Sequence, residues 1–255
     1  MARDYIYIDG QITQNQGEWS DECFVYQRMR TFGEDLQHTS EHIGLLNEAS
    51  QVLFGSQLSP TAKELQQAVA KLIRYSGRRP DMPHIVEIRL YDEGRFTCRT
   101  NETSLYKKFS LRAVHPNGVA YTSQNCFGTL PTSAFQSELN LMRSHLTYQA
   151  SGSVVVACGS DNSILHIDGG TPIMMKGHDI IVATTPKSVT AKMVADAATN
   201  IDGYKTHFRN FTLSEALEAE ELIYVDERGI TSLARLDNQR FATIIAHTLA
   251  ARITE

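Results

Sequence analysis

The sequence predicts a mixed α/β chain of two domains, and three observations support this class. Strand and helix patterns alternate in the first hundred residues, short strands fill the centre, and helices return near the end. The length of 255 residues and the hydrophobic content of 42% suffice for one large domain or two modest ones. We expect residues 1–114 to form a small α/β domain, 115–122 a linker, and 123–255 a larger domain.

The N-terminal domain is expected to begin with two strands and a helix. The strands are predicted at residues 5–9 and 22–32. A helix should follow from about Glu41 to Phe54, because its apolar residues fall near one helical face. Thr39 or Ser40 can serve as its N-cap.

A second helix and two further strands complete this domain. Ser59-Pro60-Thr61 is typical of a helix start, and Glu64 is placed to form a capping box with Thr61. The alternating segments HIVEIRLY (84–91) and GRFTCR (94–99) are predicted strands.

The C-terminal domain is expected to be rich in strands. The pattern breaks at His115-Pro116-Asn117-Gly118, which favours a linker. Beyond it, turns such as GSDNS, DGGTP and GHD separate short strands closely, which favours a barrel or curled sheet over a doubly wound one. Helices are predicted near Phe135–Gln149 and at Ser188–Thr199, Leu213–Ala219 and Asn238–Arg252.

Composition excludes several classes of partner. The net charge is -5 with no long run of either sign, so we expect no nucleic-acid partner. No segment has the length to span a membrane, and the N-terminus lacks the pattern of a signal peptide. The scattered cysteines indicate reduced thiols of a cytoplasmic protein. Cys126 is the best candidate for a catalytic thiol, although an incidental thiol is the favoured interpretation.

Two segments carry a resemblance to a known family. The run RTFGEDLQHTSEHIGLL (30–46) is similar to a strand-turn-strand pattern followed by "L-D-E-H-L-x-R-L", and SELNLMRSHLTYQ (137–149) is similar to "K-x-L-N-Y-L". These patterns belong to the class IV aminotransferases, the fold-type IV pyridoxal-phosphate (PLP) enzymes. That family includes D-amino-acid and branched-chain aminotransferases and aminodeoxychorismate lyase. By the resemblance His42 matches the family histidine, Leu45 replaces the phosphate-binding arginine, and Ser137 replaces the cofactor lysine.

Three later segments follow the same family in order. LHIDGGTPIMMKGHDIIVAT (165–184) resembles the family segment whose Glu-Gly carboxylate pairs with the cofactor's ring nitrogen, and Asp168-Gly169 falls there. KSVTAKMV (187–194) resembles "K-G-I-T-R-x-x-V", with Thr190 at the phosphate-binding threonine. EELIYVDERGITSL (220–233) resembles the last strand and loop, where Arg228 and its neighbours replace small hydroxyl residues. The resemblance implies a fold-type IV protein with two domains, a cleft between them and a homodimer.

The missing lysine limits what the resemblance implies about activity. No lysine lies between Lys108 and Lys176, and only an amine forms the Schiff base that makes PLP an electron sink. We therefore expect no covalently attached PLP and no resident cofactor, and whether the chain is an enzyme stays open. The residues expected at a cofactor-like or ligand site, by the resemblance, are Asp168, Thr190 and Arg228, with Tyr26, Arg30, Ser137, Asn140, His166 and Gly169 in the cleft.

Each candidate also has an ordinary structural interpretation. Asp168 fits a hairpin turn as well as a cleft carboxylate, Tyr26 fits the core, and Ser137 fits a helix N-cap. Isolated histidines are more often packed or solvated than functional. No metal-ligand spacing, GxSxG elbow, Walker loop or GxGxxG fingerprint occurs.

Three hypotheses about function follow. The first is a degenerate homodimer, independent of PLP, that binds a small ligand, for example one that bears a carboxylate, in the cleft between the domains, or serves as a binding or regulatory partner. The second is an aminotransferase or lyase that uses PLP or pyridoxamine phosphate without an internal aldimine. The third is an enzyme of another class acting on a small anionic metabolite, with Arg28, Arg30, Arg143 or Arg228 neutralising its carboxylates.

Overall fold

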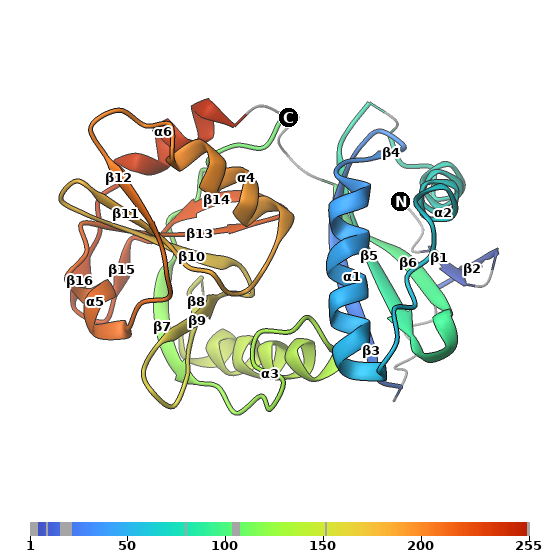
Figure 1. Cartoon of the computed structure of the whole chain (residues 1–255), viewed down its shortest axis with the longest axis horizontal. Helices are drawn as coiled ribbons and strands as arrows, with labels where there is room; N and C mark the ends of the chain where they lie inside the picture. Colours follow the sequence, from blue (N-terminus) through green and yellow to red (C-terminus); the bar gives the residue numbers. More distant parts are fainter. Residues whose placement is uncertain are drawn as a thin grey trace. The chain divides into compact units, whose positions relative to one another are not determined.

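The chain separates into two compact units (Figure 1). The computed structural model describes residues 5–8, 10–15, 22–79, 81–103, 108–150 and 152–253. Unit 1 comprises residues 1–107 and 130–133, and unit 2 comprises residues 108–129 and 134–255.

The division differs from the expected linker. Unit 2 begins at Lys108, and the expected linker 115–122 contains strand β7 (Asn117–Thr122). A Cβ on Gly118 would lie 2.9 Å from side-chain atoms of both Leu233 and Val156. Gly118 therefore allows close packing within a strand, whereas the sequence suggested a linker.

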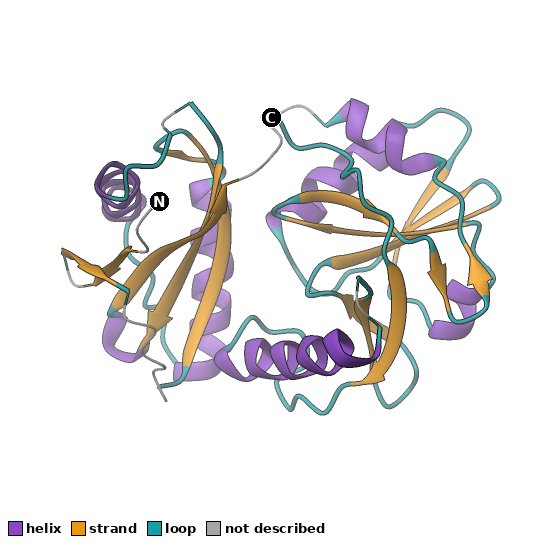
Figure 2. Cartoon of the chain, turned by 180° about the vertical axis from the view of Figure 1, so that it is seen from behind, coloured by secondary structure: helices purple, strands orange, loops and turns teal. Residues whose placement is uncertain are grey.

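Unit 1 is built on one six-stranded antiparallel sheet in the order β2-β1-β6-β5-β3-β4. Helices α1 (Thr39–Phe54) and α2 (Ala62–Tyr75) accompany this sheet (Figure 2). Their apolar side chains pack with those of the sheet in one core. Alternation along β3 places Val25 and Met29 in this core. The strands are β1 (Tyr5–Ile8), β2 (Gln11–Gln14), β3 (Phe24–Phe32), β4 (Asp35–Leu36), β5 (His84–Tyr91) and β6 (Phe96–Thr103).

The start of α1 differs from the expected cap. Its N-cap is His38, which has a left-handed backbone (φ 51°) and makes no side-chain cap bond. Thr39 is already helical, and its hydroxyl donates to the Leu36 carbonyl (3.3 Å). The expected cap at Thr39 or Ser40 was therefore wrong, because this helix begins directly after a tight turn.

The capping box at α2 confirms the sequence pattern and supports a prediction. Thr61 Oγ1 accepts from the Glu64 N–H (3.3 Å), and Glu64 Oε2 accepts from the Thr61 N–H (2.8 Å). We expect Thr61→Ala to lower the free energy of unfolding by about 1 kcal/mol. Urea denaturation would measure this, with Thr39→Ala as the matched control because that threonine caps nothing. An unchanged unfolding midpoint for Thr61→Ala would contradict the prediction.

A buried carboxylate stands among three arginines in the sheet of unit 1. Glu87 is fully buried on β5, and its carboxylate accepts from Arg28 Nε (3.1 Å), Arg89 Nε (2.9 Å) and Arg99 Nη2 (2.6 Å). Arg28, Glu87 and Arg99 lie directly opposite one another on three adjacent strands. Burial alone would raise the pKa of Glu87, but the three guanidinium groups outweigh it and lower that pKa to about 2.

Unit 2 contains two five-stranded sheets, in the orders β12-β11-β10-β13-β14 and β16-β15-β7-β8-β9. The closely spaced strands expected in the centre of the chain form most of both. Beyond β7, the strands are β8 (Val154–Cys158), β9 (Ile164–Ile167), β10 (Thr171–Lys176), β11 (Asp179–Val182), β12 (Lys205–Phe208), β13 (Glu221–Asp226), β14 (Gly229–Ser232), β15 (Arg235–Leu236) and β16 (Gln239–Arg240).

Strands β10, β13 and β14 of the first of these sheets are buried on both faces. Along β10, Met174 packs into a core shared with the other sheet, whereas Ile173 and Met175 pack beneath helices α4 (Val189–Ala198) and α6 (Ile245–Arg252). This explains the continuous apolar runs of β10 and β13. The remaining helices are α3 (Ser133–Gln149) and α5 (Leu213–Leu217). No helix in the described residues is long and apolar enough to cross a bilayer.

The N–H groups at the start of helix α6 donate to a carboxylate from another element, strand β13. Glu221 of β13 is fully buried, and its Oε2 accepts from the N–H groups of Ile244 (2.9 Å) and Ile245 (2.6 Å). Its Oε1 accepts from the Ser232 hydroxyl (3.0 Å). The expected helix from Asn238 therefore starts later, at Ile245, after the short strand β16.

Candidate functional site

The candidate site in unit 2 is centred on a two-residue turn after β9. Ile167 and Gly170 exchange backbone hydrogen bonds of 3.1 and 2.8 Å across Asp168 and Gly169. Both turn residues have positive φ (51° and 85°), as a type I′ turn requires. A Cβ on Gly169 would lie only 3.0 Å from Leu139 Cδ2. The hairpin-turn interpretation of Asp168 is therefore correct, and the turn also fixes the position of its carboxylate.

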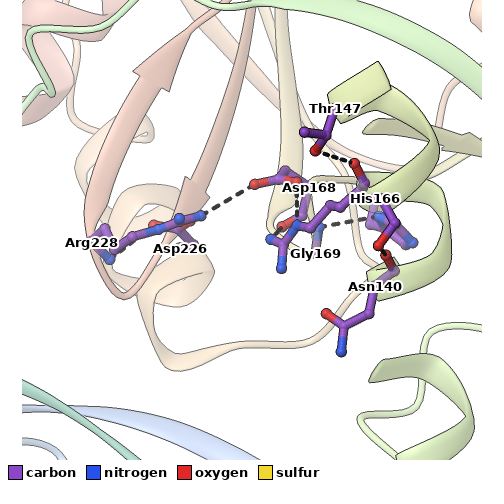
Figure 3. Close-up of polar contacts among 9 residues, drawn as sticks. Asn140, Thr147, His166, Asp168, Gly169, Asp226 and Arg228 are labelled. Carbon is purple, nitrogen blue, oxygen red and sulfur yellow. Dashed lines mark hydrogen bonds and ion pairs between the residues drawn. The ribbon is translucent and has the colours of Figure 1, made fainter. Parts of the chain in front are cut away.

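Two arginines from different elements meet at this carboxylate. Arg143 of α3 donates from Nε to Asp168 Oδ1 (2.8 Å) and from Nη2 to the Asp168 carbonyl (2.9 Å). Arg228, from the turn between β13 and β14, reaches Asp168 Oδ2 with Nη2 at 3.4 Å (Figure 3). Both carboxylate oxygens of Asp168 therefore already accept from a guanidinium group.

Arg228 is itself held by a second carboxylate. Its Nε donates to Asp226 Oδ2 (2.8 Å), its Nη2 also contacts that oxygen, and its backbone N–H donates to Asp226 Oδ1 (2.8 Å). Burial opposes the charge, but the adjacent Asp226 carboxylate outweighs it and raises the pKa of Arg228 above its ordinary value. The result is a chain of alternating charges, Arg143, Asp168, Arg228 and Asp226, which sums to zero.

His166 stabilises the turn through a hydrogen bond to its backbone. Its side chain is buried on β9, and its Nδ1 accepts from the Gly169 N–H (3.2 Å; Figure 3). The ring of Phe135 lies edge-on to the imidazole at 4.8 Å. Burial lowers the pKa of His166 to about 4, so the ring is neutral at pH 7 and carries its proton on Nε2. His166 is thus a packed, neutral histidine that fixes the turn.

The α3 residues expected in the cleft differ in exposure from Arg143. Ser137 and Asn140 are exposed on α3, while Leu139, Met142 and Leu146 are buried. Ser137 is the fifth residue of the helix, so the N-cap interpretation was wrong. The helical period that buries Leu139 and Leu146 also turns Arg143 inward, and this signal could have identified Arg143 as the partner of Asp168.

Thr190 lies in the first turn of α4. Its hydroxyl is 3.1 Å from the hydroxyl of Ser188, which caps the helix by accepting from the Ala191 N–H (3.0 Å). The Ser188 hydroxyl lies 3.4 Å from that of Thr171, at the start of β10. The serine that replaces the family glycine here is therefore an N-cap, and it ties α4 to the strand that follows the Asp168 turn.

The remaining candidates belong to unit 1. Tyr26 is buried on β3 and Arg30 is half-buried on the same strand, while Leu45 is half-buried on α1. His42 is buried on α1, and its Nδ1 lies 3.1 Å from Gln27 Oε1. An amide oxygen only accepts, so Nδ1 carries a proton. Burial lowers the pKa of His42 to about 3, so the ring is neutral at pH 7.

These groups do not match what the resemblance requires of a PLP site. By the resemblance Ser137 stands at the position of the family lysine and offers no amine, and every lysine in the described residues of unit 2 is exposed. The carboxylate that would face a protonated ring nitrogen is already paired with two cations. The lysines concerned are Lys108, Lys176, Lys187, Lys192 and Lys205.

Comparisons with known proteins identify the fold. No protein-family model matches the sequence, and no curated protein matches it. Among solved structures, the branched-chain aminotransferase of Thermoproteus uzoniensis with norvaline has a TM-score of 0.78 and 12% identity, over 98% of this chain and 93% of that one. The branched-chain amino acid aminotransferase of Escherichia coli has a TM-score of 0.76 and 11% identity, over 97% of this chain and 92% of that one.

A third similar structure is a fold IV-transaminase from Curtobacterium pusillum, with a TM-score of 0.75 and 15% identity, over 98% of this chain and 97% of that one. At such low identity the likeness concerns the arrangement of the elements. The chain therefore has the two-domain α/β fold of the fold-type IV aminotransferases, as its sequence predicted.

Proposed function

We propose that this chain is a fold-type IV protein that binds a small carboxylate-bearing ligand without holding PLP as an internal aldimine. The ion pairing of Asp168 carries this proposal. A ring cation at this carboxylate would have to compete with Arg143 at 2.8 Å and Arg228 at 3.4 Å. The hydroxyl of Ser137 also cannot form an imine, so the cofactor would lack its covalent bond to the protein as well as its ion pair with Asp168.

The same two arginines favour an anionic ligand. Their side chains are 31% and 25% exposed, so a ligand can reach them. Arg143 and Arg228 each use Nε and Nη2 for protein contacts, and within the described part of the chain neither Nη1 has a protein partner. Guanidinium groups with free donors bind carboxylates in a planar, charge-assisted geometry. We further propose that the protein is a cytoplasmic homodimer.

The first test concerns the covalent cofactor. Purified protein incubated with PLP should show no absorbance band of an aldimine, and treatment with borohydride should leave its intact mass unchanged. A borohydride-dependent mass increase of one reduced cofactor would overturn the proposal. The positive control is the Ser137→Lys variant, which provides an amine at the position in question and shows whether an adduct would be detected.

The second test concerns the ligand. A thermal-shift screen with amino acids, dicarboxylates and aromatic carboxylates should find compounds that raise the melting temperature. Arg143→Ala and Arg228→Ala should each remove this stabilisation, whereas Arg240→Ala, an exposed arginine of β16, should retain it. Stabilisation of the wild type by pyridoxamine phosphate but by no carboxylate would instead favour the second hypothesis, non-covalent cofactor use.

A further inference from the structure

The four linked side chains of the candidate site have a fixed charge balance. Arg143 and Arg228 bring two positive charges, and Asp168 and Asp226 bring two negative ones. Asp168 is only 10% exposed in its side chain, so its interactions are weakly screened by water. A ligand with a protonated ring nitrogen would have to displace Arg143 or Arg228 from Asp168, whereas a ligand with a neutral ring would not.

We propose that Arg143 is the specificity-determining residue of this site, because its guanidinium occupies the Asp168 carboxylate and excludes ligands with a protonated ring nitrogen. This inference rests on the proposed function, since it explains which ligands the site refuses. Removing Arg143 should therefore convert Asp168 into an acceptor for a ring cation.

The contacts assign this role to Arg143 rather than to Arg228. Arg143 makes two short bonds to Asp168, one to Oδ1 (2.8 Å) and one to the carbonyl (2.9 Å). Arg228 is 3.4 Å from Oδ2 and makes its short contacts with Asp226. Loss of Arg143 would leave Oδ1 without its short bond, while Arg228 would remain 3.4 Å from Oδ2.

The fold should tolerate the change. The turn that holds Asp168 rests on backbone bonds between Ile167 and Gly170 and on the bond from Asp168 N–H to the Val155 carbonyl (2.7 Å). Arg143 contributes to none of these backbone bonds, and its side chain is 31% exposed at the surface of α3. Arg143→Gln keeps most of the stem, and Arg143→Met keeps the stem without any polar group.

Titration calorimetry with pyridoxamine phosphate tests the inference on the full chain. Arg143→Gln should bind this probe at least tenfold more tightly than the wild type, because one charge-assisted hydrogen bond becomes available. The double variant Arg143→Gln, Asp168→Asn should lose that gain. Phenyl phosphate, which lacks the ring nitrogen, should bind Arg143→Gln no more tightly than the wild type, and Arg240→Gln should behave as the wild type with both probes.

Two results would overturn the inference. One is a folded Arg143→Gln or Arg143→Met, judged by circular dichroism, that binds pyridoxamine phosphate no better than the wild type. The other is a gain in affinity for pyridoxamine phosphate that persists in the double variant, which would mean that the probe does not gain its new contact at Asp168. Failure of the proposed function is distinguishable, because it is read on the wild type, as a borohydride-dependent adduct or as no response to carboxylates.

Discussion

Replacing Glu87 with glutamine should lower the free energy of unfolding by about 3 to 5 kcal/mol, the largest effect that we expect from one substitution. The carboxylate is fully buried and accepts from Arg28, Arg89 and Arg99. Glutamine keeps the shape but leaves three guanidinium groups around a neutral amide. Removing one partner of a buried ion pair leaves uncompensated charge, which costs far more than the pair itself contributes.

Urea denaturation of the Glu87→Gln variant would measure this loss. The matched control is Glu34→Gln, because Glu34 also pairs with an arginine, Arg74, but at the exposed surface, where such pairs contribute about 1 kcal/mol or less. A difference of less than about 1 kcal/mol between the two variants would show that the arginines of the sheet relax into solvent without the carboxylate.

Acidification from pH 6.5 to pH 4 should destabilise the protein by about 3 kcal/mol for each of two buried histidines, His42 and His166. Burial lowers the pKa of His42 from 6.5 to about 3 and that of His166 to about 4. Both are neutral in the folded state, whereas the unfolded chain takes up protons below pH 6.5. Their contribution is thus complete above pH 6.5 and is lost as pH falls toward the folded pKa. The pKa of Glu87 adds a further loss only below about pH 4.5, its ordinary value.

The measurement is the free energy of unfolding as a function of pH. His166→Asn retains an acceptor for the Gly169 N–H and should reduce the slope between pH 6 and 4.5 by about one proton, that is, by about 1.4 kcal/mol per pH unit. His247→Asn, at an exposed position of α6, should keep the wild-type slope. An unchanged slope for His166→Asn would mean that His166 is protonated in the folded protein.

Local signals in the sequence predicted the elements that depend on local interactions. The capping box of Thr61 and Glu64 involves residues three positions apart, and the strand His84–Tyr91 follows from its own alternating pattern. The incorrect predictions concern elements whose structure depends on contacts with a distant segment of the chain. Gly118 packs against Leu233, and the start of α6 depends on Glu221, more than twenty residues earlier. Neither contact can be predicted from the residues that are adjacent in the sequence.

In the candidate site, too, the local turn was predicted from the sequence and the contacts with distant residues were not. The turn at Asp168 and Gly169 was predicted from its own two residues, because that pair favours positive φ at both positions. The partners of Asp168 come from α3 and from the turn after β13, 25 and 60 residues away in sequence. Arg228 was singled out as a cofactor-binding candidate and Arg143 only as a possible ligand contact, so their shared engagement of one carboxylate emerged only from the fold.

The carboxylate of Glu221 has a consequence for the order in which unit 2 can mature during translation. Strand β13 emerges from the ribosome before residues 244–246, whose N–H groups this carboxylate requires. Until those residues leave the exit tunnel, the buried Glu221 Oε2 lacks the N–H donors of Ile244 and Ile245, and Leu249 has not yet joined the core. Unit 2 therefore cannot complete its folding before residues 244–246 have been released.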